Sequence, residues 1–491
     1  MGTVGRASAA RAEGTVGVPV GAGGSGGPGG PGGPGGPAQS TPHTSSRSAV
    51  LDVIRAAGTI SRVGLVRATG FTGATISTVV RRLIDDGLVV ETGRAESTGG
   101  KPRVLLQLNR SARYAVGVHL DQAGLTYVLT NLGGAVVARM SRAGAGAEDP
   151  PVVVARMAGE VDALIDGVGV DRGRVLGLGL VSPGPLTPTS GMRLTPPAMR
   201  PWEDYPLDRA LAEATGLPVV LDNDATAAAL GEHWSGDVGG AATFAALYMG
   251  TGIGAGLFVG GLPYRGASGN AGEIGHVCLD VEGPECWCGA RGCTEVLAGP
   301  AAVVAAARAD RELARLTGLT GSDGRERHRP SVVAEFAAVA RAARAGEPAA
   351  RALLERSARH LAVAARTLAN VMDLELLVLT GPSLAIAGAT YLPVVQEELD
   401  RSFFSRATHP VTVRLSASAA TAPAIGAATM VLQSELVPLR QGLRLPDNLA
   451  DAEPGAVRTP PAGPAPTGVR SGAPPERPSP PHARTGGRQP R

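Results

Sequence analysis

All four cysteines of the chain lie between residues 278 and 293, close behind a histidine. The spacing of Cys286, Cys288 and Cys293, with glycines inside the loop, allows a short segment to turn back and bring three thiolates together. Tetrahedral zinc needs one more ligand, and His276 and Cys278 both stand upstream. The spacing alone does not choose between these two. The sequence therefore predicts a zinc-binding loop.

The alternative is a pair of disulfides or a group of buried free thiols. Four cysteines in 491 residues, without the apolar core of a secretory leader, indicate a reducing compartment in which such clusters bind metal more often. We therefore expect a cytoplasmic protein. The uncharged run over residues 238–264 is divided by glycines into strand-length pieces, so no membrane segment is predicted.

Length and composition indicate several domains between flexible ends. A chain of 491 residues exceeds what one core usually serves. The net charge of +3 is small, and Lys101 is the only lysine against 45 arginines, so the number of arginines does not by itself indicate nucleic-acid binding. Residues 1–46 and 438–491, rich in Gly and Pro, are predicted to be disordered. Two folded units remain, over 47–109 and 111–437.

The first unit has the pattern of a winged helix-turn-helix. Helices are predicted over residues 48–57, 62–68 and 73–86, and strands over 88–91 and 104–108. Ser61 and Thr72 are N-cap candidates for the second and third helices, and a glycine follows each helix. The polar, glycine-rich segment between the strands predicts the hairpin that forms the wing.

The third helix is the candidate for contact with DNA. Ile76, Val80 and Leu83 share the face that must pack inward, so small hydroxyl residues and arginines face outward. This composition suits a helix in the major groove, and the basic residues of the wing suit phosphate or the minor groove. The alternative is a helical protein-interaction module with a solvated basic face. We predict that DNA is bound by Thr72, Ala74, Thr75, Ser77, Thr78, Arg81, Arg82, Arg94, Lys101 and Arg103.

The second unit alternates strands and helices, which is typical of an α/β protein with a cleft. Its other predicted elements are a hairpin over 114–130 with its turn at 122–124, strands over 175–181, 219–221 and 376–380, and helices over 225–233, 301–307 and 332–372. At a strand end, Asp224 could accept a proton from a substrate hydroxyl, and Asn223 and Glu273 could hydrogen-bond neighbouring hydroxyls. The alternative for Asn223 and Asp224 is helix capping. A glycine-rich turn at 250–254 could approach a phosphate.

Four motifs in this order resemble the ROK family, which combines bacterial sugar kinases with sugar-responsive repressors. They are LDNDATAAAL, MGTGIGAGLFVGGLPYRG, NAGEIGH and CWCGARGCTE, and the wing segment STGGKPR precedes them. The resemblance covers residues 45–437 and extends to the xylose- and N-acetylglucosamine-type repressors. It implies a two-lobed, actin-like ATPase fold of the ribonuclease H-like class behind the winged helix-turn-helix, and assembly as a homodimer or homotetramer.

The resemblance also implies ligand sets. Zinc would be held by His276, Cys286, Cys288 and Cys293, which leaves Cys278 as a neighbour. A sugar or sugar phosphate would be bound by Asn223, Asp224, Glu273, His276 and Glu295. In the kinase members Asp224 would be the catalytic base, with ATP as the cofactor only if kinase activity is retained. The turn that approaches the phosphates would contain Gly250, Thr251, Gly252 and Gly254.

Departures from the kinase pattern favour the repressor branch. Kinase members open with a D-x-G-G-T hairpin, whereas here Asp121 is followed by Gln122-Ala123-Gly124-Leu125, so leucine stands where we expect a hydroxyl. The nucleotide-side Gly-Gly turn reads Gly381-Pro382. Phosphoryl transfer depends on positioning the phosphates, so this chain is expected to lose most of that rate. The glycines at 250–256 are intact, which a need for positive φ would also explain.

A further departure concerns the ligand. Ala198 and Met199 precede Trp202 where relatives often carry an asparagine, so one sugar contact is expected to be missing. The leading hypothesis is a dimeric, sugar-responsive repressor that binds a DNA operator. The alternatives are an ATP-dependent, glucokinase-like sugar kinase with an attached DNA-binding domain, and a constitutive DNA-binding protein whose second unit only dimerises.

Overall fold

The computed structural model describes residues 46–94, 103–145, 148–187, 191–192, 197–235, 238, 240–319 and 330–435. The predicted terminal segments, except Ser46, and the wing residue Lys101 lie outside the described residues. The first unit contains the predicted helices and strands in the predicted order, and also a short strand, β1 (Thr59–Ser61), that was not predicted. The elements are α1 (Ser46–Ala57), α2 (Arg62–Thr69), α3 (Gly73–Asp85) and an antiparallel sheet ordered β1-β3-β2 (Thr59–Ser61, Val104–Leu108 and Val89–Arg94).

Local capping explains where these helices begin and end. The Ser61 side chain accepts a hydrogen bond from the Gly64 N–H at the start of α2, and Thr72 accepts one from the Thr75 N–H at the start of α3, both at 3.2 Å. Gly70 ends α2 with a φ of 71°, a conformation that glycine adopts without steric cost. The two N-caps and this C-cap are the ones predicted from the sequence.

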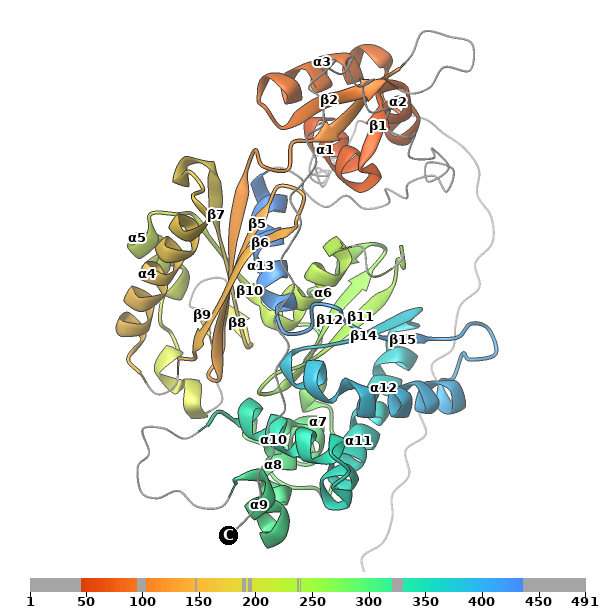
Figure 1. Ribbon diagram of the computed structural model, residues 1–491. Helices are drawn as coiled ribbons and strands as arrows, with labels where there is room; N and C mark the ends of the chain where they lie inside the picture. The colour runs from red at the N-terminus through yellow and green to blue at the C-terminus, as the bar shows by residue number, and fades with distance from the viewer. Residues whose placement is uncertain are drawn as a thin grey trace, which may run out of the picture. The chain divides into compact units, whose positions relative to one another are not determined.

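The rest of the described chain forms two lobes, each built on a five-stranded sheet (Figure 1). The first sheet is ordered β10-β7-β4-β5-β6 (Val219–Asn223, Val175–Ser182, Tyr114–Leu120, Gly124–Asn131 and Val136–Ala143). The second is ordered β13-β12-β11-β14-β15 (Leu262–Pro263, Ile253–Val259, Phe244–Met249, Leu376–Thr380 and Thr412–Leu415). In each sheet, the first three strands along the chain pair antiparallel. The fourth strand then pairs in parallel with the first, and the fifth pairs in parallel with the fourth. This repeated topology is the predicted two-lobed, actin-like fold.

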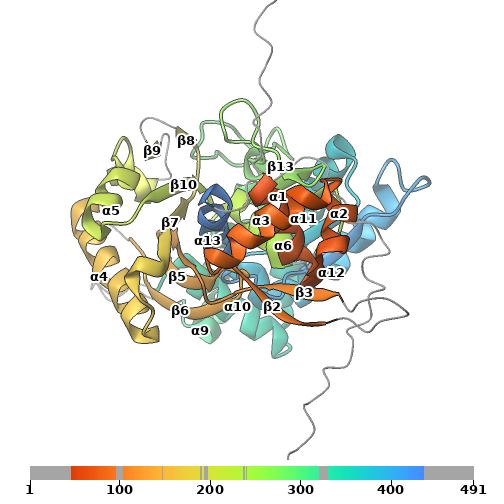
Figure 2. The ribbon, with the colours of Figure 1, turned by 90° about the horizontal axis from the view of Figure 1, so that it is seen from above.

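Two helices pack against each other between the sheets, as Figure 2 shows from above. Helix α6 (Asp224–Ser235) contacts β11 and β12, and α13 (Ala422–Glu435) contacts β4 and β7. Helix α13 lies so close to both β4 and α6 that a Cβ atom at Gly117 of β4 would lie 1.9 Å from the Ala424 carbonyl oxygen, and one at Gly426 of α13 would lie 1.7 Å from the Ala227 carbonyl oxygen of α6. Only glycine fits at these positions, so these packed helices fix the position of the first residue of α6, Asp224.

The remaining described helices pack either on one of the two sheets or on one another. The first lobe has α4 (Pro150–Val168) and α5 (Leu207–Thr215), and the second has α7 (Thr294–Ala298), α8 (Pro300–Ala309), α9 (Arg311–Thr317), α10 (Val332–Arg344), α11 (Pro348–Met372) and α12 (Pro382–Ser402). The prediction of one helix over 332–372 is wrong. The chain breaks after Arg344, where Gly346 has a φ of 98° and Pro348 starts α11, a residue type that favours a helix start over a helix interior.

Short elements complete the described chain. They are the 3-10 helices η1 (Arg172–Arg174), η2 (Pro197–Trp202) and η3 (Ile274–His276), and the two-stranded pairing of β8 (Leu186–Thr187) with β9 (Gly191–Met192). The uncharged run 238–264 contains β11, β12 and β13, as predicted. Among the described helices, none is by itself long and apolar enough to cross a bilayer, and α2 and α3 reach that length and composition only together, with a bend of 118°.

Candidate functional site

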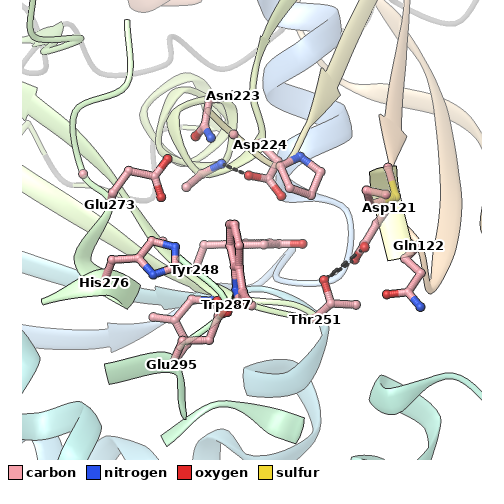
Figure 3. A pocket seen from close by; sticks show the side chains of 18 of the residues that line it. Asp121, Gln122, Asn223, Asp224, Tyr248, Thr251, Glu273, His276, Trp287 and Glu295 are labelled. Carbon is pink, nitrogen blue, oxygen red and sulfur yellow. Dashed lines mark hydrogen bonds between the residues drawn. The ribbon is translucent and has the colours of Figure 1, made fainter. Parts of the chain in front are cut away.

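A cavity of about 280 Å³ lies where turns and strand ends from both lobes meet (Figure 3). The first lobe contributes the β4–β5 turn and the end of β10, and the second contributes the β11–β12 turn, η3 and α7. The polar and aromatic residues lining it are Asp121, Gln122, Asn223, Asp224, Tyr248, Thr251, Glu273, His276, Trp287 and Glu295. The five residues predicted to bind sugar therefore line one cavity.

Asn223 and Asp224 both cap α6 and line the cavity. The Oδ1 atom of Asn223 accepts a hydrogen bond from the Thr226 N–H at 3.0 Å, and Oδ1 of Asp224 accepts one from the Ala225 N–H at 2.8 Å. The other carboxylate oxygen of Asp224 lies 3.4 Å from Nε2 of His119. Capping and ligand contact are thus compatible, because each side chain has a second polar atom.

His119 is absent from the residues predicted from the sequence. It is 5% exposed and belongs to β4, two residues before Asp121. Two polar residues at alternate positions near the end of an otherwise apolar strand were the available signal, since alternate side chains share one face. The Nε2 atom of His119 is thus the contact that the first lobe makes with the Asp224 carboxylate.

The carboxyl group of Glu273 has a strongly altered ionisation. Burial raises the pKa of Glu273 to about 7, and the negative charges of Asp224 and Glu295 add to this shift. Near neutral pH the group is therefore divided between its acid and carboxylate forms. In either form it can hydrogen-bond a hydroxyl group, as donor or as acceptor.

Asp121 connects the turns of the two lobes. The Thr251 hydroxyl donates to its carboxylate oxygens, at 3.0 and 3.2 Å. Burial raises the pKa of Asp121, while the neighbouring His119 and the Thr251 hydrogen bond oppose that shift. Leu125, by contrast, is fully buried in the core of the first lobe, so Asp121 and Gln122 are the residues of this hairpin that meet the cavity.

Close contacts explain the glycines of the β11–β12 turn. A Cβ atom at Gly252 would lie 2.4 Å from Oε2 of Glu295, and one at Gly250 would lie 2.6 Å from the Tyr248 hydroxyl. The explanation by positive φ is wrong, because neither glycine adopts a positive φ. The turn needs glycine because two site residues press against it. Gly254 likewise faces α6, with a Cβ position 3.1 Å from that of Ala225.

Tyr248 is a second site residue that the sequence analysis missed. Its side chain lines the cavity from β11, and its hydroxyl oxygen has no hydrogen-bond partner among the described residues. Burial raises its pKa well above the usual value, so the hydroxyl is neutral. A buried polar atom without a protein partner beside a cavity is free to hydrogen-bond a ligand or a water molecule there. The only indication in the sequence was that Tyr248 carries the one polar side-chain group of the strand Phe244–Met249.

The predicted metal-binding residues come together beside this cavity. One ligand atom from each of His276, Cys286, Cys288 and Cys293 lies within 4.8 Å of the other three. The Cys288 and Cys293 sulfurs are 3.8 Å apart, close to the edge of about 3.8 Å that follows from Zn–S bonds of about 2.3 Å in a tetrahedron. A disulfide bond would need about 2.05 Å. The donor set and its spacing therefore fit zinc, while Cys278 is exposed and outside the group.

The cysteine loop also positions the cavity wall. Trp287, between two of the cysteines, donates its indole N–H to Oε1 of Glu295 at 2.8 Å. Its ring meets the His276 ring edge to face, with 5.0 Å between the centroids. The other Glu295 oxygen accepts the Ile253 N–H at 3.1 Å. Folding of the loop thus orients two predicted sugar-binding residues.

The wall formed by η2 is apolar. Met199 is buried and lines the cavity, and Trp202 is fully buried in the core of the first lobe. The side chain of Ala198 lies outside the description. The Met199 thioether is at most a weak hydrogen-bond acceptor, so the absence of one sugar contact on this side stays a prediction.

The residues predicted to contact DNA are separate from this cavity. Helix α3 buries Ile76, Val79, Val80 and Leu83. Its outward residues Thr72, Ala74, Ser77, Thr78, Arg81 and Arg82 are exposed, Thr75 is partly exposed, and Arg103 is exposed just before β3. Arg94 belongs to β2, and Lys101 lies outside the described residues. The predicted outward face of the third helix is thus confirmed for the described residues.

Comparison with known proteins gives the same fold and family. The ROK family model matches residues 123–434. The xylose repressor of Caldicellulosiruptor bescii is 26% identical over 377 residues, which are 77% of this chain and 92% of that protein. The Bacillus subtilis xylose repressor is 31% identical over 245 residues, which are 50% of this chain and 63% of that repressor.

Solved structures agree with these relatives. A ROK family transcriptional regulator, a homolog of the E. coli MLC protein, superposes with a TM-score of 0.62 at 26% identity, over 79% of this chain and 95% of that one. A ROK family glucokinase from Streptomyces griseus, in complex with glucose and AMPPNP, superposes with a TM-score of 0.55 at 26% identity, over 65% and 98%. With its two-lobed fold and a family match over most of its length, this chain belongs to the ROK family.

Proposed function

We propose that this protein is a sugar-responsive transcriptional regulator, a repressor of carbohydrate-metabolism genes that a sugar releases from its operator. The observation that carries this proposal is the presence, in one ROK chain, of a sugar-sized cavity and of a helix α3 with exposed hydroxyl and arginine residues. The similarity to two xylose repressors over 77% and 50% of this chain supports the same function.

In this proposal DNA is bound by α3 in the major groove. Its buried apolar face fixes the helix on the core of the first unit, so the exposed residues form one continuous edge. Two copies of the chain in a dimer would place two such helices on the half-sites of an operator. Sugar bound between the lobes would favour an arrangement in which the half-site spacing no longer fits.

The sugar site is proposed on the geometry of the cavity. Asn223, Asp224 and Glu273 come from both lobes and offer hydrogen-bond donors and acceptors to hydroxyl groups, so a sugar that bridges them couples the lobes. We propose that zinc, held by His276 and three cysteines, stabilises the loop that orients His276 and Glu295. Zinc has this structural role wherever four protein ligands leave no open position.

The DNA contact is tested by Arg81→Ala. We expect affinity for the operator to fall by about 1–3 kcal/mol, roughly 5- to 150-fold, because the guanidinium loses its contact with a base or a phosphate. Fluorescence anisotropy at several salt concentrations measures this change, using a site first identified by genomic footprinting. A loss of a phosphate contact also lowers the salt dependence by about one unit.

The matched control is Arg139→Ala, which removes an exposed arginine from β6 in the first lobe. Its affinity for DNA should stay within about twofold, as expected for a surface substitution away from the contact. Equal losses in the two variants would mean that α3 has no special role in DNA binding.

A sugar kinase is the second candidate, favoured by one observation. Asp224 is 6% exposed at the edge of the cavity, where a catalytic base would lie. We expect no sugar-dependent release of ADP from ATP over a panel of pentoses and hexoses, because the turns that would hold phosphates are altered. Release that disappears in Asp224→Asn would establish the kinase instead.

A further inference from the structure

Helix α6 leads from the cavity toward the first unit of the chain. Its first residue, Asp224, lines the cavity (Figure 3), and Trp234 lies one residue before its end at Ser235. A rise of about 1.5 Å per residue puts Asp224 and Trp234 about 15 Å apart along the helix axis. The residues from Asp224 to Glu232 are all buried, so the helix has packed neighbours along most of its length. A shift of its first turn is therefore carried to its last turn.

The last turn of α6 contacts both lobes. The His233 ring stacks on Phe258 of β12 in the second lobe, with 4.8 Å between the ring centroids. The Trp234 ring lies against the β5–β6 turn of the first lobe, where a Cβ atom at Gly134 would lie 1.9 Å from the indole Nε1 atom. A movement of one lobe relative to the other therefore acts on these two neighbouring rings.

Trp234 also contacts the first unit. The guanidinium carbon of Arg55 in α1 lies 3.9 Å from the centroid of the indole ring, within the range of a cation–π interaction. One oxygen of Asp52, one turn earlier in α1, accepts hydrogen bonds from the Nε and Nη2 atoms of Arg55 at 3.1 and 2.9 Å. These bonds orient the guanidinium plane. The indole N–H has no hydrogen-bond partner among the described residues, so packing and the Arg55 cation hold the ring.

Apolar packing around this contact joins the same elements. One cluster of buried residues contains Val53 and Ile54 of α1, Trp234 of α6, and Ile425 and Leu432 of α13. Helix α3 packs on α1 within the first unit. A continuous series of packed side chains thus runs from the cavity, through α6 and α1, to the helix proposed to bind DNA.

We propose that Trp234 and Arg55 form the contact through which occupancy of the cavity alters the position of α3. A sugar that moves the lobes shifts the last turn of α6, and the Trp234 ring passes this shift to Arg55 and α1. The inference rests on the proposed sugar-responsive function and adds the residues that couple its two sites. Both are positioning residues, because neither lines the cavity and neither is among the residues proposed to contact DNA.

The test is a coupling ratio, the Kd for operator DNA at saturating sugar divided by the Kd without sugar. Fluorescence anisotropy measures both values on the full-length protein, with whichever of xylose, glucose and N-acetylglucosamine calorimetry shows to bind. Arg55→Gln removes the cation but keeps a polar side chain that can hydrogen-bond Asp52. Its ratio should be at least ~3-fold below that of the wild type, because a cation–π contact away from water corresponds to roughly 5- to 30-fold in an equilibrium.

The separate affinities distinguish coupling from a merely structural role. In Arg55→Gln the affinity for sugar alone and the affinity for DNA alone should stay within ~3-fold of wild type, since both binding surfaces are unchanged. Trp234→Leu removes the aromatic ring from the other side of the contact, and it should lower the ratio in the same way. The matched control is Arg47→Gln, the same change on α1 at an arginine that pairs with Asp86 of the first unit, and it should keep the wild-type ratio.

An unchanged ratio in Arg55→Gln, or in a folded Trp234→Leu, would overturn the proposal, because the contact would then only hold the first unit in place. If Trp234→Leu does not fold, Arg55→Gln decides, since the Arg55 side chain is 19% exposed and its loss leaves no large cavity. An equal fall in Arg47→Gln would also overturn the proposal. A wild-type ratio of one would instead contradict the proposed sugar response, and this inference would fail with it.

Discussion

Asp224→Asn is expected to remove the response to sugar while leaving DNA binding intact. The substituted side chain can still cap α6 through its carbonyl oxygen, so the fold should be retained. The variant loses the negative charge that a sugar hydroxyl would donate to, at a side chain that is 6% exposed. A hydrogen bond to a charged group contributes about 1.5–3 kcal/mol, so the Kd for sugar should rise roughly 10- to 150-fold.

Two titrations measure this effect. Calorimetry gives the affinity for the sugar, and anisotropy gives the affinity for the operator without sugar, which should stay within about twofold of wild type, as for a change remote from the DNA contact. The matched control is Asp208→Asn, which makes the same chemical change at an exposed position of α5, outside the cavity. Sugar binding by Asp224→Asn within a factor of three of wild type would show that this carboxylate is not a ligand.

Loss of one cysteine ligand is expected to have the second large effect. Cys288→Ser should lower the zinc content from one to nearly zero per chain. The site would keep three of its four protein ligands and lose one thiolate charge, so it would bind zinc far less tightly. The loop that carries Trp287 would then no longer hold Glu295 and His276 in place. We expect a fall in Tm on the order of 10 °C, together with loss of sugar binding.

The chain contains a matched control for this change. Cys278 lies in the same segment but is exposed and outside the group of four ligand atoms, so Cys278→Ser should keep its zinc, its Tm and its affinity for sugar. Zinc content is measured by elemental analysis of the purified protein. Loss of zinc in Cys278→Ser but not in His276→Ala would reverse the choice between the two upstream ligands.

Features with local causes were predictable from the sequence. The caps by Ser61 and Thr72 and the end of α2 at Gly70 depend only on neighbouring residues, and they lie where predicted. The zinc loop was predictable because its three cysteines fall within eight residues. The spacing alone did not decide whether His276 or Cys278 is the fourth ligand. The structure places His276, and not Cys278, with the other three cysteines.

Features that depend on contacts between distant segments were not predictable. His119 and Asp224 are 105 residues apart in sequence, and Asp121 and Thr251 are 130 apart, so no local pattern announces either pair. The glycines of the β11–β12 turn were attributed to the approach of a phosphate or to backbone conformation, whereas a Cβ atom at Gly250 or Gly252 would collide with the side chain of Tyr248 or Glu295. The break between α10 and α11 was missed because apolar periodicity continues on both sides of Gly346.

Occupancy of the ROK cavity by a sugar is expected to lower the affinity of the protein for DNA. The most direct measurement is a fluorescence anisotropy titration of operator DNA with the full-length, zinc-loaded protein, without sugar and at a sugar concentration that calorimetry shows to be saturating. We predict that the Kd for DNA rises about 5- to 150-fold when sugar is bound, the usual range of coupling between two sites. An unchanged Kd at saturating sugar would contradict it.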